Sequence, residues 1–312
     1  MYMSIQANIT GNYSESAQYP SAAVNITNHC NLQCRHCFVF REGNPNAAPV
    51  SIRDEMADDV VLDTLKQLRD RHQIRHMLWM GGEPMLKPKL LRKGVRLFQR
   101  NTITTNGTAP LIDFGGNLLY VISMDGPEDL NDAIRGEGVY QKVLGNIERL
   151  PRDFGSEFQV QTVVTRRNHQ RMEELVSSLL QTQVGWMTFS FMVPKDGEHD
   201  NPDVWDTNEE RAEAVQTIMS LKQKYPRFIR NTIRHLELMM PPYAERVTSV
   251  CPATKTVLSL YLEDDHFTTP FCCYGNDVDC ARCGAWVVFH GADKMERAGL
   301  IDWEVDAENQ EN

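Results

Sequence analysis

The sequence of 312 residues has no excess of positive charge and no long apolar run, and each absence argues against a class of protein. It carries 32 Lys and Arg against 42 Asp and Glu, a formal net charge of −10. Because phosphate binding depends on Lys and Arg that displace counterions, this balance argues against a nucleic-acid partner. No stretch approaches the roughly 18 apolar residues of a membrane span, and the N-terminus has neither a basic start nor an apolar run. We therefore expect a cytoplasmic protein without a membrane span.

The eight cysteines are clustered, and a reducing compartment disfavours structural disulfides, so the clusters indicate metal binding or catalysis. Cys30, Cys34 and Cys37 share one short loop directly after the strand-like residues 22–26. Three thiolates can hold three irons of a four-iron cluster and leave the fourth iron open for a reacting molecule, like the open position of a catalytic metal site. The spacing alone also permits zinc or a redox pair of cysteines.

The order of apolar runs and turn residues indicates an α/β fold. Strands are expected near residues 22–26, 76–80, 102–107, 118–126, 157–165 and 186–193, and helices near residues 51–71, 87–99, 140–150, 170–181 and 208–224. Six buried strands that alternate with helices imply a parallel sheet, which would form a partial (β/α)6 barrel when curled. Residues 1–20 are expected as an N-terminal extension, residues 21–240 as the barrel, and residues 241–312 as a small cysteine-rich extension with an acidic tail.

A second motif, Gly81-Gly82-Glu83-Pro84, follows the second expected strand. Taken in this order with the loop of three cysteines, it resembles the signature of the radical S-adenosylmethionine superfamily over roughly residues 22–194. The resemblance implies a [4Fe-4S] cluster whose open iron chelates S-adenosylmethionine and whose electron releases a 5′-deoxyadenosyl radical. A tight turn without a ligand is the alternative interpretation of the glycine motif.

Several residues would contact the cofactor. Gly81 and Gly82 let the backbone approach a ligand closely, while Glu83 and the nearby carbonyls offer acceptors and Pro84 rigidifies the turn. By resemblance, Ser123 and Arg135 would meet the ribose or the carboxylate, for which a guanidinium fork is suited. Further candidates, each with core packing or a plain turn as the alternative, are His36, Phe38, Asn106, Val163 and Phe191.

A second set of thiols lies near the C-terminus, at Cys251, Cys272, Cys273, Cys280 and Cys283. The pattern resembles the auxiliary-cluster extensions of radical enzymes called SPASM or twitch, and also the adenosylhopane-synthase type. We expect one auxiliary [4Fe-4S] cluster on Cys251, Cys280, Cys283 and one of the vicinal pair, with a structural zinc site of four cysteines as the competitor.

The leading hypothesis is a radical enzyme that abstracts hydrogen from, or adds to, a small organic substrate such as a lipid or isoprenoid, a sugar or a nucleoside. Its electron donor would be a flavodoxin or ferredoxin, which requires a local basic patch on this acidic chain. One alternative is a maturase of a ribosomal peptide, although the first strand begins about 20 residues into the chain, which leaves no room for a leader-binding domain. Another is a non-catalytic iron–sulfur protein for electron transfer or redox sensing. Candidates for the substrate's acid, base or hydrogen donor are Tyr274, Cys273, Asp125, Glu198 and His199.

Overall fold

The computed structural model describes residues 9–11, 14, 16–41, 55–115 and 117–304. Its strands are β1 Ile9–Gly11, β2 Ser21–Asn25, β3 His76–Met80, β4 Arg100–Thr105, β5 Leu118–Ser123, β6 Glu157–Val164, β7 Met187–Phe191, β8 Val257–Glu263 and β9 His266–Thr269. Its α-helices are α1 Asp58–His72, α2 Pro88–Gly94, α3 Glu128–Arg135, α4 Val139–Glu148, α5 Met172–Leu179, α6 Asn208–Lys224, α7 Ile233–Glu237, α8 Tyr243–Ser249, α9 Pro252–Thr256 and α10 Trp286–Arg297.

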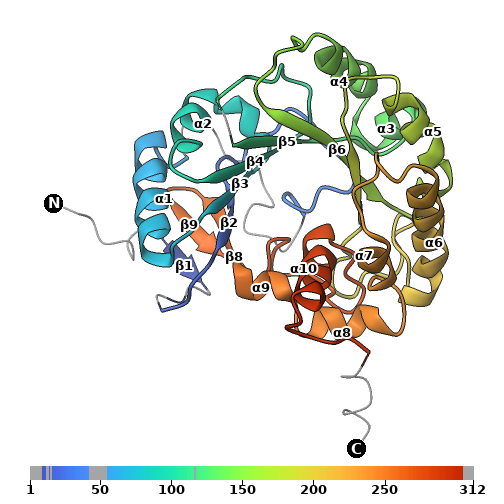
Figure 1. The fold of residues 1–312 in the computed structure, drawn as a ribbon. Helices are drawn as coiled ribbons and strands as arrows, with labels where there is room; N and C mark the ends of the chain where they lie inside the picture. The colour runs from blue at the N-terminus through green and yellow to red at the C-terminus, as the bar shows by residue number, and fades with distance from the viewer. Residues whose placement is uncertain (1–8, 12–13, 15, 42–54, 116, 305–312) are drawn as a thin grey trace, which may run out of the picture.

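The strands form one sheet in the order β1-β9-β8-β2-β3-β4-β5-β6-β7. Neighbouring strands from β8 and β2 through β7 run parallel, and the sheet curls into the wall of an open barrel with the helices outside it (Figure 1). This confirms the α/β class and the partial barrel. Parallel strands need long crossover connections, which the helices between them supply.

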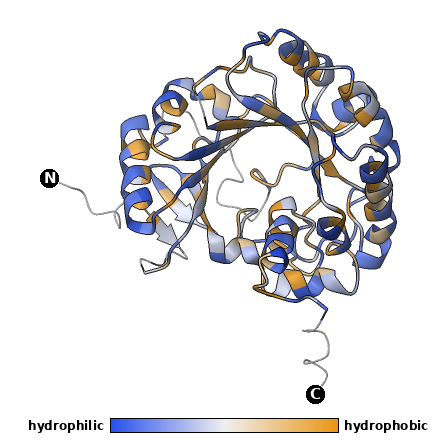
Figure 2. Ribbon diagram, viewed as in Figure 1, coloured by the Kyte–Doolittle hydropathy of each residue, from blue (hydrophilic) through white to orange (hydrophobic). Residues whose placement is uncertain are grey.

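Burial on both faces explains why the strands are nearly continuous apolar runs. In β7 every residue is buried, and in β2 only the first residue is partly exposed. The covering helices are amphipathic: in α5 the buried residues Met172, Leu175, Val176 and Leu179 follow the helical period, and the outer helices carry both hydrophobic and hydrophilic residues (Figure 2).

The C-terminal part of the chain belongs to the same sheet. β8 pairs with β2 over the whole length of that strand, from Ser21 opposite Val257 to Asn25 opposite Tyr261, and the N-terminal strand β1 pairs with β9. The segment between β9 and α10 reaches across to β7, where the Phe191 backbone N–H donates to the Gly284 carbonyl at 2.8 Å. The segment from residue 241, expected as a separate module, therefore closes the gap between the two edges of the barrel wall (Figure 1).

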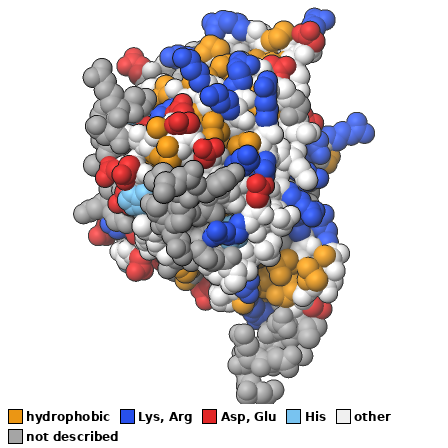
Figure 3. Space-filling model, turned by 90° about the vertical axis from the view of Figure 1, so that its left-hand side faces the viewer, with side chains coloured by type: hydrophobic (Ala, Val, Ile, Leu, Met, Phe, Trp, Pro, Cys, Tyr) orange, Lys and Arg blue, Asp and Glu red, His pale blue; other side chains and the backbone are white. Residues whose placement is uncertain are grey.

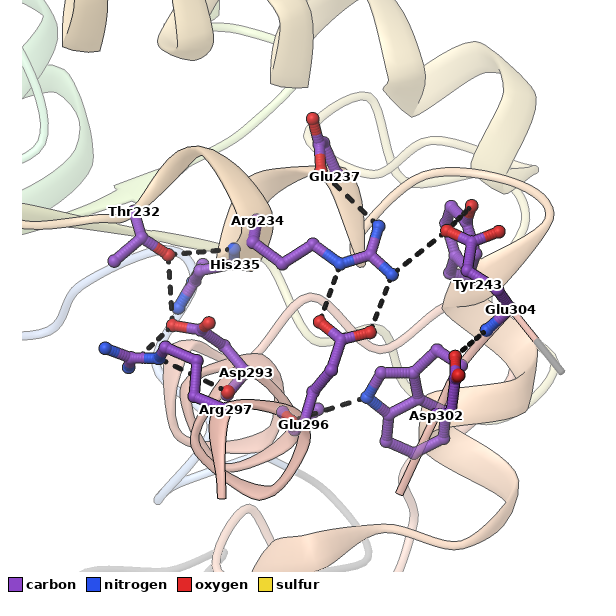
Figure 4. Close-up of polar contacts among 12 residues, drawn as sticks. Thr232, Arg234, His235, Glu237, Tyr243, Asp293, Glu296, Arg297, Asp302 and Glu304 are labelled. Atoms are coloured by element: carbon purple, nitrogen blue, oxygen red, sulfur yellow. Dashed lines mark hydrogen bonds and ion pairs between the residues drawn. The ribbon is translucent and has the colours of Figure 1, made fainter. Parts of the chain in front are cut away.

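Helix α10 is held by polar contacts with α7 and the residues around it (Figure 4). The Arg234 guanidinium binds Glu296 through two contacts of 2.7 Å, and the Thr232 hydroxyl donates to Asp293 at 3.0 Å. An Arg–carboxylate pair with two parallel bonds fixes orientation as well as distance. These contacts orient α10 against the barrel.

Some elements differ from the sequence-based expectation. Helix α1 begins at Asp58 rather than near residue 51, although residues 51–54 lie outside the described ranges. Helix α2 ends at Gly94, where a side chain would collide with the Trp79 ring. The short helices α3, α7, α8 and α9 and the 12-residue helix α10 were not expected. Among the described residues, no helix has the length and apolarity that crossing a membrane requires.

Candidate functional site

The loop that follows β2 carries Cys30, Cys34 and Cys37, all half-buried. The Cys30 sulfur accepts from the Leu32 backbone N–H at 3.4 Å and from Asn106 Nδ2 at 3.8 Å, and the Cys34 sulfur accepts from Arg135 Nη1 at 3.9 Å. Burial raises the pKa of Cys34 to about 11, and the neighbouring thiols Cys37 and Cys30 add to the rise. N–H donors stabilise thiolates, so this environment suits sulfurs that are bound to a metal rather than free.

The glycine turn after β3 lies directly against this loop. The Gly82 N–H donates to the Thr27 carbonyl at 2.8 Å, and the Glu83 N–H donates to the His29 carbonyl at 2.6 Å. A Cβ on Gly81 would lie 2.6 Å from the Thr27 oxygen, and one on Gly82 would collide with the His29 carbonyl. The two glycines are therefore required for the close approach of the two loops.

Glu83 connects the glycine turn to the end of β4 through its side chain. Its side chain is buried and accepts from the Met85 N–H at 2.9 Å, the Thr105 hydroxyl at 2.7 Å and the Asn106 N–H at 2.7 Å. These donors occupy the carboxylate, so Glu83 joins the ends of β3 and β4 instead of presenting its oxygens to a ligand. Asn106 links this group to the cysteine loop, because its Nδ2 donates to Asn31 Oδ1 at 2.9 Å.

Asp125, at the end of β5, is the centre of a buried ion-pair group. Its Oδ2 lies 2.7 Å from both His36 Nε2 and Arg135 Nε, and its Oδ1 accepts from the Val163 N–H at 2.9 Å. Although burial by itself raises the pKa of this carboxyl, Arg135 and His36 outweigh burial and lower it to about 2. One carboxylate thus orients both the histidine of the cysteine loop and the arginine beside Cys34.

The other expected cofactor contacts divide into two groups. Ser123 and Val163 are half-buried at the carboxyl ends of their strands, on the side of the cysteine loop. Phe191 is 1% exposed and packs against the Trp205 ring, with ring centroids 6.0 Å apart, and against Gly284. The packing alternative therefore describes Phe191 better than a contact with a cofactor.

The cysteine loop also contacts the C-terminal segment. The rings of Phe38 and Tyr274 lie 4.6 Å apart, and Arg41 donates to the carbonyls of Val193 and Tyr274 and to Asp277 Oδ1, the last at 2.8 Å. Sequence reasoning did not single out Arg41, because its partners lie more than 150 residues away and no motif surrounds it. These contacts place the second group of cysteines next to the first loop.

The five C-terminal thiols lie close enough to influence one another. Burial raises the pKa of Cys283 to about 12, and Cys272 and Cys251 add to the rise. Burial is the main cause that raises the pKa of Cys280, and the neighbouring thiols Cys272 and Cys251 raise it further. The Tyr261 hydroxyl of β8 donates to the Cys273 carbonyl at 2.9 Å, which anchors the vicinal pair to the barrel wall.

A cavity of about 300 Å³ lies beside the vicinal pair Cys272 and Cys273. Tyr19, Thr254, Ser259, Thr269 and Phe271 are among its other lining residues. Its size is at the lower end of the range for small-molecule pockets, and its walls combine apolar surface with a few hydroxyl groups.

The arrangement of the thiols distinguishes between a single metal ion and a cluster. In the ranges given above, no three side chains of His, Cys, Asp or Glu converge as ligands of one ion. A four-iron cluster takes one thiolate at each iron, so its ligands surround a larger centre than a single zinc ion does. The first loop carries the three thiols that such a cluster requires, and the sulfurs of Cys30 and Cys34 accept N–H bonds.

The candidates for a substrate acid, base or hydrogen donor lie in different environments. Tyr274 lies beside the cysteine loop, and burial raises the pKa of its hydroxyl, while Cys273 lies among the C-terminal cysteines. Asp125 is held in its ion pairs. Glu198 accepts from the Lys195 N–H and Asn201 Nδ2 within its own loop, and His199 is exposed, 3.6 Å from Asp206. Asp125 and Tyr274 are therefore the candidates that contact the first loop directly.

The family model of the radical SAM superfamily matches residues 24–179, half of the chain. The chain belongs to the radical SAM superfamily, whose members use a [4Fe-4S] cluster and S-adenosylmethionine, and it is an enzyme. The enzymatic names of its relatives disfavour the alternative of a non-catalytic iron–sulfur protein.

Particular relatives cover different parts of the chain. An AdoMet-dependent heme synthase of Oleidesulfovibrio alaskensis is 31% identical over 46% of this chain and 38% of its own length. The mycofactocin maturase MftC of Mycolicibacterium smegmatis is 25% identical over 79% of this chain and 63% of its own. The solved structure of anSMEcpe with bound AdoMet and a peptide has a TM-score of 0.61 at 17% identity, covering 90% of this chain and 84% of that one, which shows the shared fold. The chain spans only about two fifths of the first curated relatives that it matches.

Proposed function

We propose that Cys30, Cys34 and Cys37 hold the catalytic [4Fe-4S] cluster and that the enzyme acts on a small organic molecule held near the C-terminal cysteines. When bound, the cluster and S-adenosylmethionine supply a 5′-deoxyadenosyl radical. The observation that carries the proposal is the joint geometry of the loop after β2 and the turn after β3, which the Glu83 N–H bond to the His29 carbonyl joins at 2.6 Å.

The residues around this geometry have separate roles. The donors Asn106 and Arg135 contact the sulfurs of Cys30 and Cys34 and favour their thiolate forms. Arg135, oriented by Asp125, also offers a guanidinium edge to an anionic group such as a carboxylate. Ser123 and Val163 line the adjoining strand ends and would contact the rest of the cofactor.

The second group of thiols is proposed to hold an auxiliary [4Fe-4S] cluster. Its support is the mutual influence of Cys251, Cys272, Cys280 and Cys283 and their position across from the first loop, where Phe38 meets Tyr274. A reactive group released at the first loop would then meet a substrate enclosed between the two sets of cysteines.

Two substrate classes have specific support. A small organic molecule is the leading candidate, and the cavity beside Cys272 and Cys273 has a suitable volume of about 300 Å³; its lining includes Tyr19 and residues 257–259, at the amino ends of β2 and β8, and no residue of the first loop. A ribosomal peptide is the second candidate, because the relatives with the widest coverage include a maturase and a protein solved with a bound peptide.

The experiment is anaerobic incubation of reconstituted protein with S-adenosylmethionine and dithionite, with 5′-deoxyadenosine measured by chromatography. We expect 5′-deoxyadenosine or an adenosylated product, and a triple variant Cys30→Ala, Cys34→Ala, Cys37→Ala should form neither. Iron and sulfide analysis of that variant should still find about one cluster per chain. Zinc in place of iron there would contradict the auxiliary cluster, and an intact wild-type cluster that cleaves no cofactor would contradict the catalytic assignment.

The substrate class is tested with cell extract treated in two ways. One portion of the extract is digested with a protease, which is then inactivated. If the substrate is a small molecule, the digested extract should stimulate cofactor cleavage as strongly as the untreated extract does. Loss of the stimulation after proteolysis would favour the peptide.

A further inference from the structure

One arginine of this chain is buried without a carboxylate partner. Lys and Arg side chains usually stay in contact with water, and they are spread over the side of the molecule that Figure 3 shows. Arg211, near the start of α6, is only 3% exposed. Among the residues that the structure describes, no Asp or Glu forms an ion pair with its guanidinium. A buried cation without a counter-charge is strongly destabilising, so a negative charge is expected beside it.

Backbone carbonyls hold the Arg211 guanidinium in place without neutralising its charge. Nη1 donates to the carbonyls of Arg282 at 2.6 Å and of Cys283 at 3.1 Å, and Nη2 donates to the Met239 carbonyl at 3.0 Å. Within the described part of the chain, Nε has no hydrogen-bond partner. Carbonyl groups are dipoles without a net charge, so the guanidinium keeps its positive charge away from water. Two of the three carbonyls belong to the loop that carries Cys280 and Cys283.

The other cations of this region have carboxylate partners of their own. Arg282 Nε donates to Asp279 Oδ2 at 2.7 Å. Arg41, which reaches the same segment from the first cysteine loop, pairs with Asp277 Oδ1 at 2.8 Å. Both of these charges are therefore neutralised by nearby carboxylates, whereas the charge of Arg211 is not.

A solvent anion would have little room beside Arg211. The void lined by Arg211 and Arg282 has a volume of about 10 Å³, which is space for about one water molecule. Its other walls include Met192, Val204 and Trp205. The negative charge that acts on the guanidinium is instead that of the thiolate of Cys283, one of the C-terminal cysteines. The counter-charge is therefore expected on the side of the thiols.

We propose that Arg211 supplies the counter-charge of a metal centre formed by the C-terminal cysteines and favours its reduced form. This rests on the proposed function, which assigns an auxiliary [4Fe-4S] cluster to these thiols. Four thiolates outnumber the positive charges of a [4Fe-4S] core or of a zinc ion, so a centre of either metal is anionic. One added electron makes an iron–sulfur centre more negative, and a nearby cation stabilises that state. Arg211 is thus a positioning residue that fixes the loop of Cys283 and contributes its charge.

The first test separates the charge of Arg211 from its packing. It uses the full-length triple variant Cys30→Ala, Cys34→Ala, Cys37→Ala, in which the C-terminal cysteines alone hold metal, and compares melting temperatures before and after anaerobic reconstitution. Arg211→Met keeps a long unbranched side chain and removes the charge. We expect it to lower the melting temperature of the loaded protein more than that of the metal-free protein, because only the loaded protein contains the anionic centre. Equal losses in both states would overturn the proposal.

Two further variants are the controls for this comparison. Arg211→Lys keeps the positive charge and should retain more of the stabilisation by metal than Arg211→Met does. Lys224→Met removes an exposed cation from the other end of α6, about 20 Å away along the helix, and should change the melting temperature little in either state. Stabilisation of the metal-free protein by added chloride, lost in Arg211→Met, would show that a solvent anion supplies the counter-charge and would also overturn the proposal.

The second measurement is the reduction potential of the loaded triple variant, followed by the electron-spin spectrum during titration with dithionite. Arg211→Met should lower the midpoint potential, so that the ratio of reduced to oxidised centre at a given potential falls about tenfold, which is about 59 mV for a one-electron couple. Arg211→Lys should lie closer to the parent protein, and Lys224→Met should match it. An unchanged midpoint potential in Arg211→Met would overturn the claim that its charge favours the reduced form.

Metal analysis distinguishes a failure of this proposal from a failure of the proposed function. If the triple variant binds zinc, the auxiliary cluster and the claim about its reduced form are both wrong, while the melting comparison on the zinc-loaded protein still decides about the counter-charge. If the variant binds no metal, the second metal centre itself is wrong, and the role of Arg211 is wrong with it.

Discussion

Gly82 leaves no space for a side chain, because an added Cβ would collide with the carbonyl carbon and oxygen of His29, which are backbone atoms that cannot turn aside. We expect Gly82→Ala to push the cysteine loop away from β3 and to lower the iron bound per chain after reconstitution. The control is Gly185→Ala, where nothing lies within 4 Å of the added atom. Iron analysis and the electron-spin spectrum of the reduced protein provide the measurement. Full iron content with an unchanged spectrum in Gly82→Ala would contradict the tight packing of the two loops.

Asp125 provides a second prediction, because it is fully buried between Arg135 and His36. Asp125→Asn keeps the shape but leaves the Arg135 guanidinium buried without its counter-charge, which costs about 3 kcal/mol when a buried pair is broken. We also expect weaker binding of S-adenosylmethionine, since Arg135 would lose its orientation. Denaturant unfolding and a binding titration are the measurements. Asp129→Asn removes an exposed partner of Arg171 and should change stability little. Equal stability of the two variants would show that the ion pair of Asp125 with Arg135 contributes little to the stability of the fold.

Sequence reasoning could find the residues that lie in compact motifs, and it missed those defined by distant partners. Cys30 and Gly82 belong to short patterns whose chemistry is readable from spacing. The ion pair between Asp125 and His36 joins residues 89 positions apart, and Arg41 contacts Asp277 across 236 positions. The motif also does not reveal that hydrogen bonds occupy the Glu83 carboxylate, because two of the donors, Thr105 and Asn106, lie at the end of β4.

At the scale of elements, most of the strands from β2 to β7 could be predicted because burial on both faces favours apolar residues, and β4, which reads RNTITT, could be predicted from its β-branched residues and the turn that follows it. Helix α3 reads EDLNDAIR and has few apolar residues, so its pattern is weak, whereas α5, of the same length, has four buried apolar residues. β8 was missed for another reason: the cysteines around it suggested a small metal module, although Val257–Glu263 is itself an apolar run that pairs with β2.

The contact between α7 and α10 contains the buried His235 and the partly buried His290, and this predicts a pH dependence. Burial lowers the pKa of His235 from 6.5 to about 3 and that of His290 to about 4. The unfolded chain takes up protons near pH 6.5 while the folded chain stays neutral at these rings, so stability is full above pH 6.5 and falls below it. The loss is about 1 kcal/mol for His235 at pH 5.5.

The measurement is the melting temperature between pH 7.5 and pH 5.5. His235→Phe, which keeps a planar ring next to Trp286 and His290, should lose less stability on acidification than wild type does. The charged groups around the pair, Asp293, Lys294 and Arg297, stay in place in this variant. His199→Phe changes an exposed ring and serves as the control. Parallel curves for wild type and His235→Phe would show that these histidines do not carry the pH dependence.

The whole molecule depends on contacts between its two ends. β8 shields one edge of β2, the strand that leads into the cysteine loop, and β9 in turn pairs with β1 near the N-terminus. The loop between β9 and α10 bonds to β7 at the opposite edge, through Phe191 and Gly284. The barrel wall is therefore continuous only when the segment from residue 241 onward is present.

This continuity predicts the result of a truncation at residue 240, which would remove the expected C-terminal module. The shortened chain would expose the backbone edge of β2, where Ala22 and Val24 are fully buried in the intact protein, and an exposed apolar edge promotes aggregation. We expect insoluble protein or, if it is soluble, loss of the cooperative thermal transition seen by circular dichroism. The control keeps the whole chain and replaces Cys251, Cys280 and Cys283 by Ala, which removes ligands without removing strands. If the truncated chain folded cooperatively and bound iron at Cys30, Cys34 and Cys37, the cysteine module would be separable from the barrel, and the pairing of β8 with β2 would contribute little to its stability.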